Sequence, residues 1–190
     1  MDALETILTR ASPRKMSDPG PNDQDLRAML MAACRAPDHG RLRPWHFVTI
    51  QGDARFRFAE VLSSSLQARS PSVSEAQLDR ERAKALRAPL IVTAAAVPSQ
   101  GKIPEIEQIA AVAAAVQNLV LAAHALGYGA FWRTGAPAYD PAVASALGLP
   151  ETATIVGFVY IGTIVEPGAN VAPVLEGRVE DWRGSSPRPS

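Results

Sequence analysis

The chain has 190 residues, of which 47% are hydrophobic and 20% are charged. Nineteen Lys plus Arg residues balance nineteen Asp plus Glu residues, so the formal net charge is zero. This length and composition predict one globular domain over residues 1–190 and exclude an intrinsically disordered chain. Zero net charge argues against a broad nucleic-acid-binding surface, because phosphate contacts require an excess of Lys and Arg.

The single cysteine, Cys34, excludes an intrachain disulfide. Cys34 lies within a predicted helix, beside its apolar stripe, so we expect a buried and unreactive thiol. The first residues include acids and no apolar run, which argues against a signal peptide. These features together favour a cytoplasmic protein.

Apolar spacing and turn residues predict an alternation of helices and strands. Helices are expected over residues 3–10, 22–35, 54–65, 75–87, 105–126 and 141–147. Strands are expected over residues 46–51, 90–97, 130–134 and 155–164. Residues 13–21 contain three prolines and residues 68–74 contain several serines, so both stretches are expected to be irregular. This order predicts helices packed on both faces of a small sheet.

The helix expected over residues 105–126 is unusually apolar. Residues 109–126 contain no Asp, Glu, Lys or Arg, which is near the minimum length for a membrane span. Eight of its eighteen residues are Ala, and it includes Gln117, Asn118 and His124, so we interpret it as a core or interface helix and expect no membrane contact. A helix that is apolar on all sides must be covered by its own domain or by a partner, which predicts a homodimer.

The last 25 residues have little regular patterning. They begin near residue 166 with Pro167-Gly168 and end in Gly-Ser-Ser-Pro-Arg-Pro-Ser. We therefore expect a C-terminal arm over about residues 166–190 with a flexible tail.

Cations recur where predicted elements end. Arg10 and Ser12 follow the first helix, Arg35 and His39 bracket the end of the second, and Arg133 closes a short strand. Guanidinium groups bind phosphate through paired hydrogen bonds, although Arg at a helix end can also simply complement the helix dipole. Together the clusters indicate an anionic, partly aromatic ligand. The three histidines lack metal-ligand spacing, so no metal is expected.

The order of these short motifs resembles the FMN-dependent nitroreductase family, in particular its compact single-domain bacterial subgroup. The resemblance extends to about residue 165. It is carried by Arg10-x-Ser12, Arg35-Ala-Pro-Asp-His39, Arg43-Pro-Trp-His-Phe, Gln117-Asn-Leu, Leu126-Gly-Tyr-Gly, Trp132-Arg-Thr-Gly, Leu147-Gly-Leu-Pro and Tyr160-Ile-Gly.

The resemblance implies an α+β fold with a mostly antiparallel central sheet flanked by helices. It also implies an intertwined homodimer with FMN at the interface and a C-terminal arm that embraces the partner. The positions that match the subgroup's FMN contacts are Arg10, Ala11, Ser12, Arg35, His39, Trp132, Arg133 and Thr134. A looser match to a nicotinamide-nucleotide contact covers Ala122, Ala123, His124, Ala125, Leu126 and Gly127. No catalytic side chain is expected, because FMN itself carries the redox chemistry.

The implied activity is hydride transfer from NADH or NADPH through FMN to nitroaromatic, quinone or similar oxidised small molecules. Other FMN-dependent chemistry, such as enone reduction, dehalogenation or flavin cleavage, stays open, as does a non-catalytic dimeric flavin-binding protein. Without the resemblance, the residues alone describe a helical anion-binding domain. The family often has Asn and Gln before the Pro-Trp pair, where this chain has Arg41 and Arg43. Which residue contacts the flavin ring therefore stays open, and the candidates are Arg14, Lys15, Arg41 and Arg43.

Overall fold

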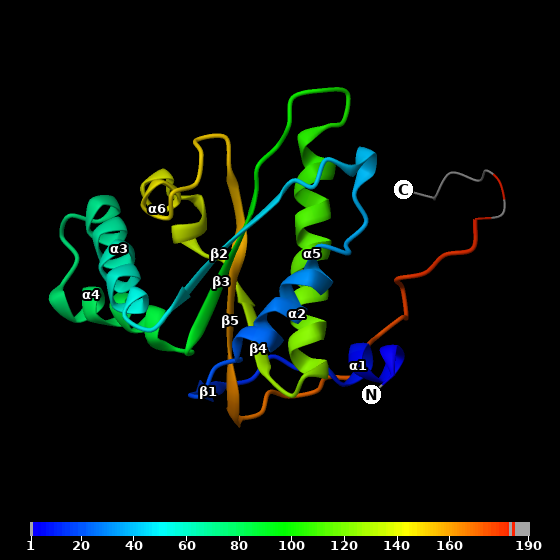
Figure 1. Cartoon of the computed structure of the whole chain (residues 1–190), viewed down its shortest axis with the longest axis horizontal. Helices are drawn as coiled ribbons and strands as arrows, with labels where there is room; N and C mark the ends of the chain where they lie inside the picture. The colour runs from blue at the N-terminus through cyan, green and yellow to red at the C-terminus, as the bar shows by residue number, and fades with distance from the viewer. Residues whose placement is uncertain (1, 183, 185–190) are drawn as a thin grey trace.

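The computed structural model describes residues 2–182 and 184. Its centre is an antiparallel sheet with the strand order β1-β5-β3-β2, in which β4 also pairs with β5 (Figure 1). The strands are β1 (Lys15–Ser17), β2 (Trp45–Gln51), β3 (Leu90–Ala96), β4 (Gly129–Arg133) and β5 (Thr154–Glu166). Strand β4 pairs with the edge of β5 that faces away from β3, and β1 pairs with the last residues of β5, beyond the part that pairs with β3.

Helices cover both faces of the sheet, as the sequence predicts. The helices are α1 (Ala3–Thr9), α2 (Asp23–Ala33), α3 (Ala54–Arg69), α4 (Glu75–Arg82), α5 (Glu105–Ala125) and α6 (Pro141–Ala146). Three short 3-10 helices are η1 (His39–Arg41), η2 (Ala83–Leu86) and η3 (Ala136–Tyr139). Figure 1 shows α2 and α5 on one side of the sheet and α3, α4 and α6 on the other. The α+β class with an antiparallel sheet is therefore confirmed.

Strand β3 divides the apolar core into two layers. Leu90 and Val92 pack into the cluster with α2 and α5, whereas Ile91 and Ala95 pack into the cluster with α3 and α6. Successive side chains of a strand point to opposite faces, so a strand covered on both faces has no exposed side. All of β3 is buried, which explains its uninterrupted apolar sequence.

Helix α5 lies along one face of the sheet and buries a stripe that includes Val112, Val116 and Leu119. By length and composition alone, α5 could also cross a membrane. In this structure 44% of its most apolar 18-residue window is buried inside the protein, and core helices of globular proteins have the same character. Its first turn remains open, with Ile106 70% exposed.

Three elements differ from the expectations. Strand β1 lies in the stretch expected to be irregular, because its three residues owe their extended form to pairing with β5. Helix α3 continues to Arg69 and includes residues expected to form a loop. The helix expected over residues 75–87 is α4 followed by η2, since the chain tightens at Ala83.

The expectation of a buried Cys34 thiol was wrong. Helix α2 ends at Ala33, and Cys34 is its C-terminal cap. The buried positions at this end of the helix are Met29 and Ala33, which leaves Cys34 on the solvent side.

Two apolar surfaces have no cover within the described chain. Leu4, Ile7 and Leu8 share a face of α1, as expected from their spacing, but each is at least half exposed. After β5 the chain leaves the body of the protein (Figure 1). The exposed apolar side chains of this arm are Val171, Val174, Leu175, Val179 and Trp182. The expected flexible tail falls largely on residues 183 and 185–190, which lie outside the described residues.

Candidate functional site

A cavity of about 450 Å³ lies between α3, η2 and the strands β4 and β5. Five aromatic side chains and four cations line it: Phe58, Phe131, Trp132, Phe158, Tyr160, Arg69, Lys84, Arg87 and Arg133. Thr134 and Gly135 complete the wall where β4 ends. Of the sequence-predicted FMN positions, Trp132, Arg133 and Thr134 therefore border one cavity.

A second hollow of about 430 Å³ shares four lining residues with this cavity, namely Arg87, Phe131, Arg133 and Tyr160. Its other wall is the N-terminal segment with Pro13, Arg14, Lys15 and Met16. The shared residues place the two hollows side by side, and we treat them together as the candidate site. Of the four cations left open for a ring contact, Arg14 and Lys15 border this site.

Positive charge dominates the site. Burial and the neighbouring Arg87 both lower the pKa of Arg133, whose guanidinium carbon lies 3.9 Å from the centre of the Phe131 ring. Among the described residues, neither Arg87 nor Arg133 has a carboxylate within ion-pairing distance. Arg69 pairs with Asp140 at 3.7 Å, and Lys84 pairs with Glu81 at 2.5 Å. Clustered cations without counterions indicate a site for an anion.

Tyr160 supplies a buried phenol to both hollows. Burial raises the pKa of this phenol most strongly, while Arg87 and Arg133 lower it and Glu81 raises it. Because the net shift is upward, Tyr160 stays protonated at neutral pH and can donate a hydrogen bond to a ligand.

A glycine in β5 fixes the position of Trp132. The indole Nε1 donates a hydrogen bond to the Val156 carbonyl oxygen at 3.2 Å. A Cβ atom on Gly157 would lie 2.1 Å from the same Nε1 atom, so the indole occupies space that only glycine leaves free.

The segment with Arg10, Ala11 and Ser12 is half-buried, and it is held between α1 and the start of the arm. The Arg10 guanidinium donates to the Ser12 hydroxyl at 3.4 Å. A Cβ atom on Gly168 would lie 1.8 Å from the Ser12 carbonyl oxygen, which shows how closely the arm crosses this segment. These three residues lie just before the N-terminal wall of the second hollow but do not line it.

Arg35 and His39 lie on the α2–α5 side of the sheet and line neither hollow. Arg35 borders an apolar groove on α2, next to Met31 and Cys34. His39 Nδ1 lies 2.6 Å from Glu107 Oε2 in the first turn of α5. The predicted FMN residues thus form two separate groups within one chain.

The loop before β2 carries two further cations. Arg41 and Arg43 both have a left-handed backbone, with φ of 54° and 52°, and they border a small pocket beside Cys34. Non-glycine residues seldom adopt this conformation. Neither arginine reaches the site around Arg133.

The predicted nicotinamide-nucleotide residues, 122–127, form the C-terminal end of α5. Ala123 is buried, Ala122 and His124 are half-buried, and Ala125 and Leu126 are exposed. His124 Nε2 lies 3.0 Å from the Thr9 hydroxyl and so links α5 to α1. Gly127 has φ of 86°, the left-handed conformation that commonly ends a helix. These contacts give the segment a structural role, and its nucleotide contact stays a prediction.

Glu81, Lys84, Arg87 and Tyr160 were not among the sequence-predicted site residues. Lys84 is one of only three lysines beside sixteen arginines, and Arg87 ends the same charged segment. Neither feature of the sequence shows that these residues line the same cavity as Arg133, because Arg133 lies on a strand that is distant in the sequence.

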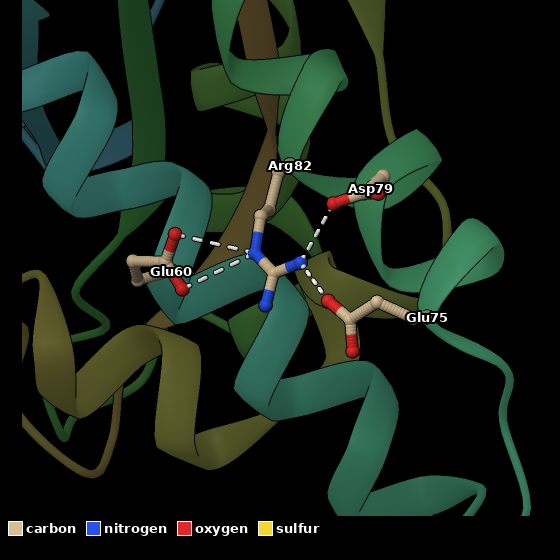
Figure 2. A network of polar contacts seen from close by, with 4 residues as sticks. All are labelled: Glu60, Glu75, Asp79 and Arg82. Atoms are coloured by element: carbon tan, nitrogen blue, oxygen red, sulfur yellow. Dashed lines mark hydrogen bonds and ion pairs between the residues drawn. The ribbon is translucent and has the colours of Figure 1, made fainter.

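A polar network holds α4 against α3 and so positions Glu81 and Lys84. Figure 2 shows the Arg82 guanidinium between Glu60 on one helix and Glu75 and Asp79 on the other. The distances from Arg82 nitrogens are 3.2 Å to Glu60, 2.6 Å to Glu75 and 2.9 Å to Asp79. Hydrogen bonds to Glu75 and Asp79 raise the pKa of Arg82 most strongly, so it is permanently charged.

Within residues 2–182 and 184, no group of three or more His, Cys, Asp or Glu side chains is placed to hold a metal ion.

Comparison with known proteins gives a consistent result. A model of the Nitroreductase family matches residues 7–163 of the chain. The protein YdjA of Escherichia coli strain K12, named provisionally as an NAD(P)H nitroreductase, is 40% identical over 164 residues, which are 86% of this chain and 88% of YdjA. A Haemophilus influenzae protein with the same provisional description is 32% identical over 178 residues, covering 93% of this chain and 96% of its own.

Solved structures share the fold. A nitroreductase-like protein from Bacillus cereus superposes with a TM-score of 0.81 at 24% identity, covering 97% of each chain. A Desulfovibrio desulfuricans protein described as a nitroreductase in complex with FMN has a TM-score of 0.76 at 23% identity, covering 97% of this chain and 99% of its own.

Proposed function

Because the chain belongs to the nitroreductase family, we propose that it is an FMN-dependent oxidoreductase. It transfers a hydride from NADH or NADPH through FMN to nitroaromatic, quinone or similar oxidised small molecules. The observation that carries this proposal is the adjoining pair of hollows around Arg133, with aromatic walls and two cations that have no carboxylate partner among the described residues.

The residues present suit FMN. Its phosphate carries nearly two negative charges and is best bound by Arg forks and hydroxyls, which Arg10, Ser12 and Arg133 supply. The flat ring suits a cavity walled by Phe131 and Trp132. The size of the main cavity, about 450 Å³, is within the ordinary range for small-molecule sites.

FMN, when bound, supplies the centre that accepts a hydride and passes it on. The protein binds it, orients it and excludes water. Arg10, Ser12 and Arg133 bind phosphate, with Ala11 and Thr134 offering backbone groups. Trp132 covers the site, and residues 122–127 contact the nicotinamide nucleotide. No side chain acts as a general acid or nucleophile.

We further propose that residues 1–190 form a single FMN-binding domain that works as an intertwined homodimer in the cytoplasm. Arg35 and His39 lie apart from the cavity of their own chain, which supports a site completed by these residues from a second copy. The exposed apolar face of α1 and the apolar arm support the same conclusion, because large uncovered apolar surfaces mark interfaces.

The test is the visible spectrum of the purified protein after incubation with FMN and gel filtration. Bands near about 370 and about 450 nm that bleach with NADH or NADPH support the proposal. Arg133→Ala should lower FMN affinity roughly 10- to 100-fold, since it removes a charge-assisted contact worth about 1.5–3 kcal/mol. A wild-type protein that retains no FMN would refute the function.

The alternatives predict different outcomes. A non-catalytic flavin carrier would bind FMN but would not be bleached rapidly by NADH or NADPH. A reductase of enones or halogenated compounds would be bleached, yet would reduce those substrates faster than nitroaromatics and quinones in a substrate screen.

A further inference from the structure

We propose that Glu81 is a positioning residue for Lys84, holding its ammonium group and offsetting its charge, and that this offset keeps Lys84 from raising the reduction potential of bound FMN. The inference rests on the proposed function, because it places FMN in the cavity that both residues line.

Glu81 is an unusual residue for its position. It lies near the end of α4 and is buried, with only 9% of its side chain exposed. A buried carboxylate is costly unless it is paired. Its ion-pair partner among the described residues is Lys84, whose Nζ lies 2.5 Å from Glu81 Oε2.

The pair faces a cluster of cations. Arg69, Arg87 and Arg133 line the same cavity, and Glu81 is the only carboxylate among its lining residues. Arg69 is already paired with Asp140. Glu81 also acts on Tyr160, whose pKa its charge raises. The electrostatic field of Glu81 thus reaches the wall where β5 borders the cavity.

This arrangement has a consequence for FMN. Reduction places extra negative charge on the flavin ring, and nearby cations favour the reduced form. Because Glu81 cancels the charge of Lys84, the flavin ring is exposed to the positive field of Arg87 and Arg133 but to little net field from the Glu81–Lys84 pair. Removing the carboxylate charge releases the full positive charge of Lys84, which favours reduction.

The test is the midpoint potential of FMN-loaded protein, measured by spectroelectrochemical titration. Glu81→Gln should shift the oxidised-to-reduced equilibrium about tenfold towards the reduced form, which is about +30 mV for a two-electron couple. Glu151→Gln is the matched control, because it makes the same charge change at an exposed residue that lines a different hollow. We expect no shift from this control.

Lys84→Gln distinguishes the pair from an isolated cation. Lys84→Gln leaves the negative charge of Glu81 without its ion-pair partner, and an uncompensated negative charge at the cavity wall disfavours reduction of the ring. The potential of Lys84→Gln should therefore fall by about 30 mV, whereas the Glu81→Gln/Lys84→Gln double variant, which loses both charges, should stay close to wild type.

Three results would overturn the inference while leaving the proposed function intact. They are an unchanged potential in Glu81→Gln, an unchanged or raised potential in Lys84→Gln, or a double variant whose potential differs from wild type by about 30 mV or more. The second result decides the question even where Glu81→Gln does not fold. Failure of the wild-type protein to bind FMN would instead refute the proposed function.

Discussion

Gly157 is the residue on which the position of Trp132 depends, and Gly157→Ala tests that dependence. The added Cβ atom would lie 2.1 Å from Trp132 Nε1, 2.6 Å from Trp132 Cδ1 and 2.9 Å from the Arg133 carbonyl oxygen. Ordinary van der Waals contact begins near 3.4 Å, so the indole must retreat by about 1.3 Å. That movement breaks the hydrogen bond from Trp132 Nε1 to Val156.

The cost follows from these contacts. Overpacking costs typically about 1–3 kcal/mol, and a lost hydrogen bond about 1 kcal/mol. Trp132 is 37% exposed, so its ring can swing towards solvent, which keeps the expected total at about 2 kcal/mol. For a chain of this size the melting temperature should fall by about 4–8 °C. Because Trp132 borders the proposed FMN cavity, the Kd for FMN should rise about tenfold.

Thermal melts of the FMN-free protein and fluorescence titration with FMN measure the two effects separately. Gly101→Ala is the control, because a Cβ atom there would have no neighbour within 4 Å and Gly101 does not have a left-handed backbone. If Gly157→Ala matches Gly101→Ala in melting temperature, the steric argument is refuted. If only the Kd for FMN is unchanged, Trp132 does not contact the flavin.

Three further predictions concern stability and assembly. Arg82→Ala should lower the melting temperature relative to wild type, and 1 M NaCl should reduce this difference by screening the ion pairs. Arg80 is exposed on the same helix, so Arg80→Ala should change the melting temperature little at low or high salt. The hydrogen bond from Ser65 most strongly lowers the pKa of Asp140, and the Ala142 N–H and Arg69 lower it further. The Asp140 carboxylate therefore stabilises the fold at pH values above its ordinary pKa of 3.8. This stabilisation is lost as the pH falls through the lower pKa of the folded state. Asp140→Asn should therefore cost about 1–2 kcal/mol at pH 7 in urea unfolding, with the difference from wild type shrinking below pH 3.8; a constant difference would contradict the assignment. Ile7→Glu on the exposed face of α1 should weaken the proposed homodimer, and an unchanged sedimentation coefficient at micromolar concentration would show that α1 is not in the interface.

The fold could be predicted where a local pattern also reflects the tertiary environment. The continuous apolar run of β3 indicates a strand covered on both faces, and the i, i+3, i+4 spacing on α2 indicates one buried face. Strand β1 could not be predicted, because three residues between prolines carry no periodicity and become extended only by pairing with β5. The exposure of Cys34 was missed because helix α2 ends at Ala33, two residues earlier than expected.

The candidate site shows the same division between local and tertiary information. Arg133 could be singled out because a cation in an apolar strand needs an exposed position or an anionic partner, and the structure places it exposed at the end of β4. Lys84 and Arg87 are separated from Arg133 by more than forty residues. The chain passes through β3 and α5 before β4 brings Arg133 to the same cavity. Glu81 and Lys84 are spaced for an ordinary surface pair on a helix, and only the packing of α4 against α3 buries the carboxylate. Arg133 could therefore be predicted from its local sequence, whereas the excess positive charge of the cavity arises from the fold.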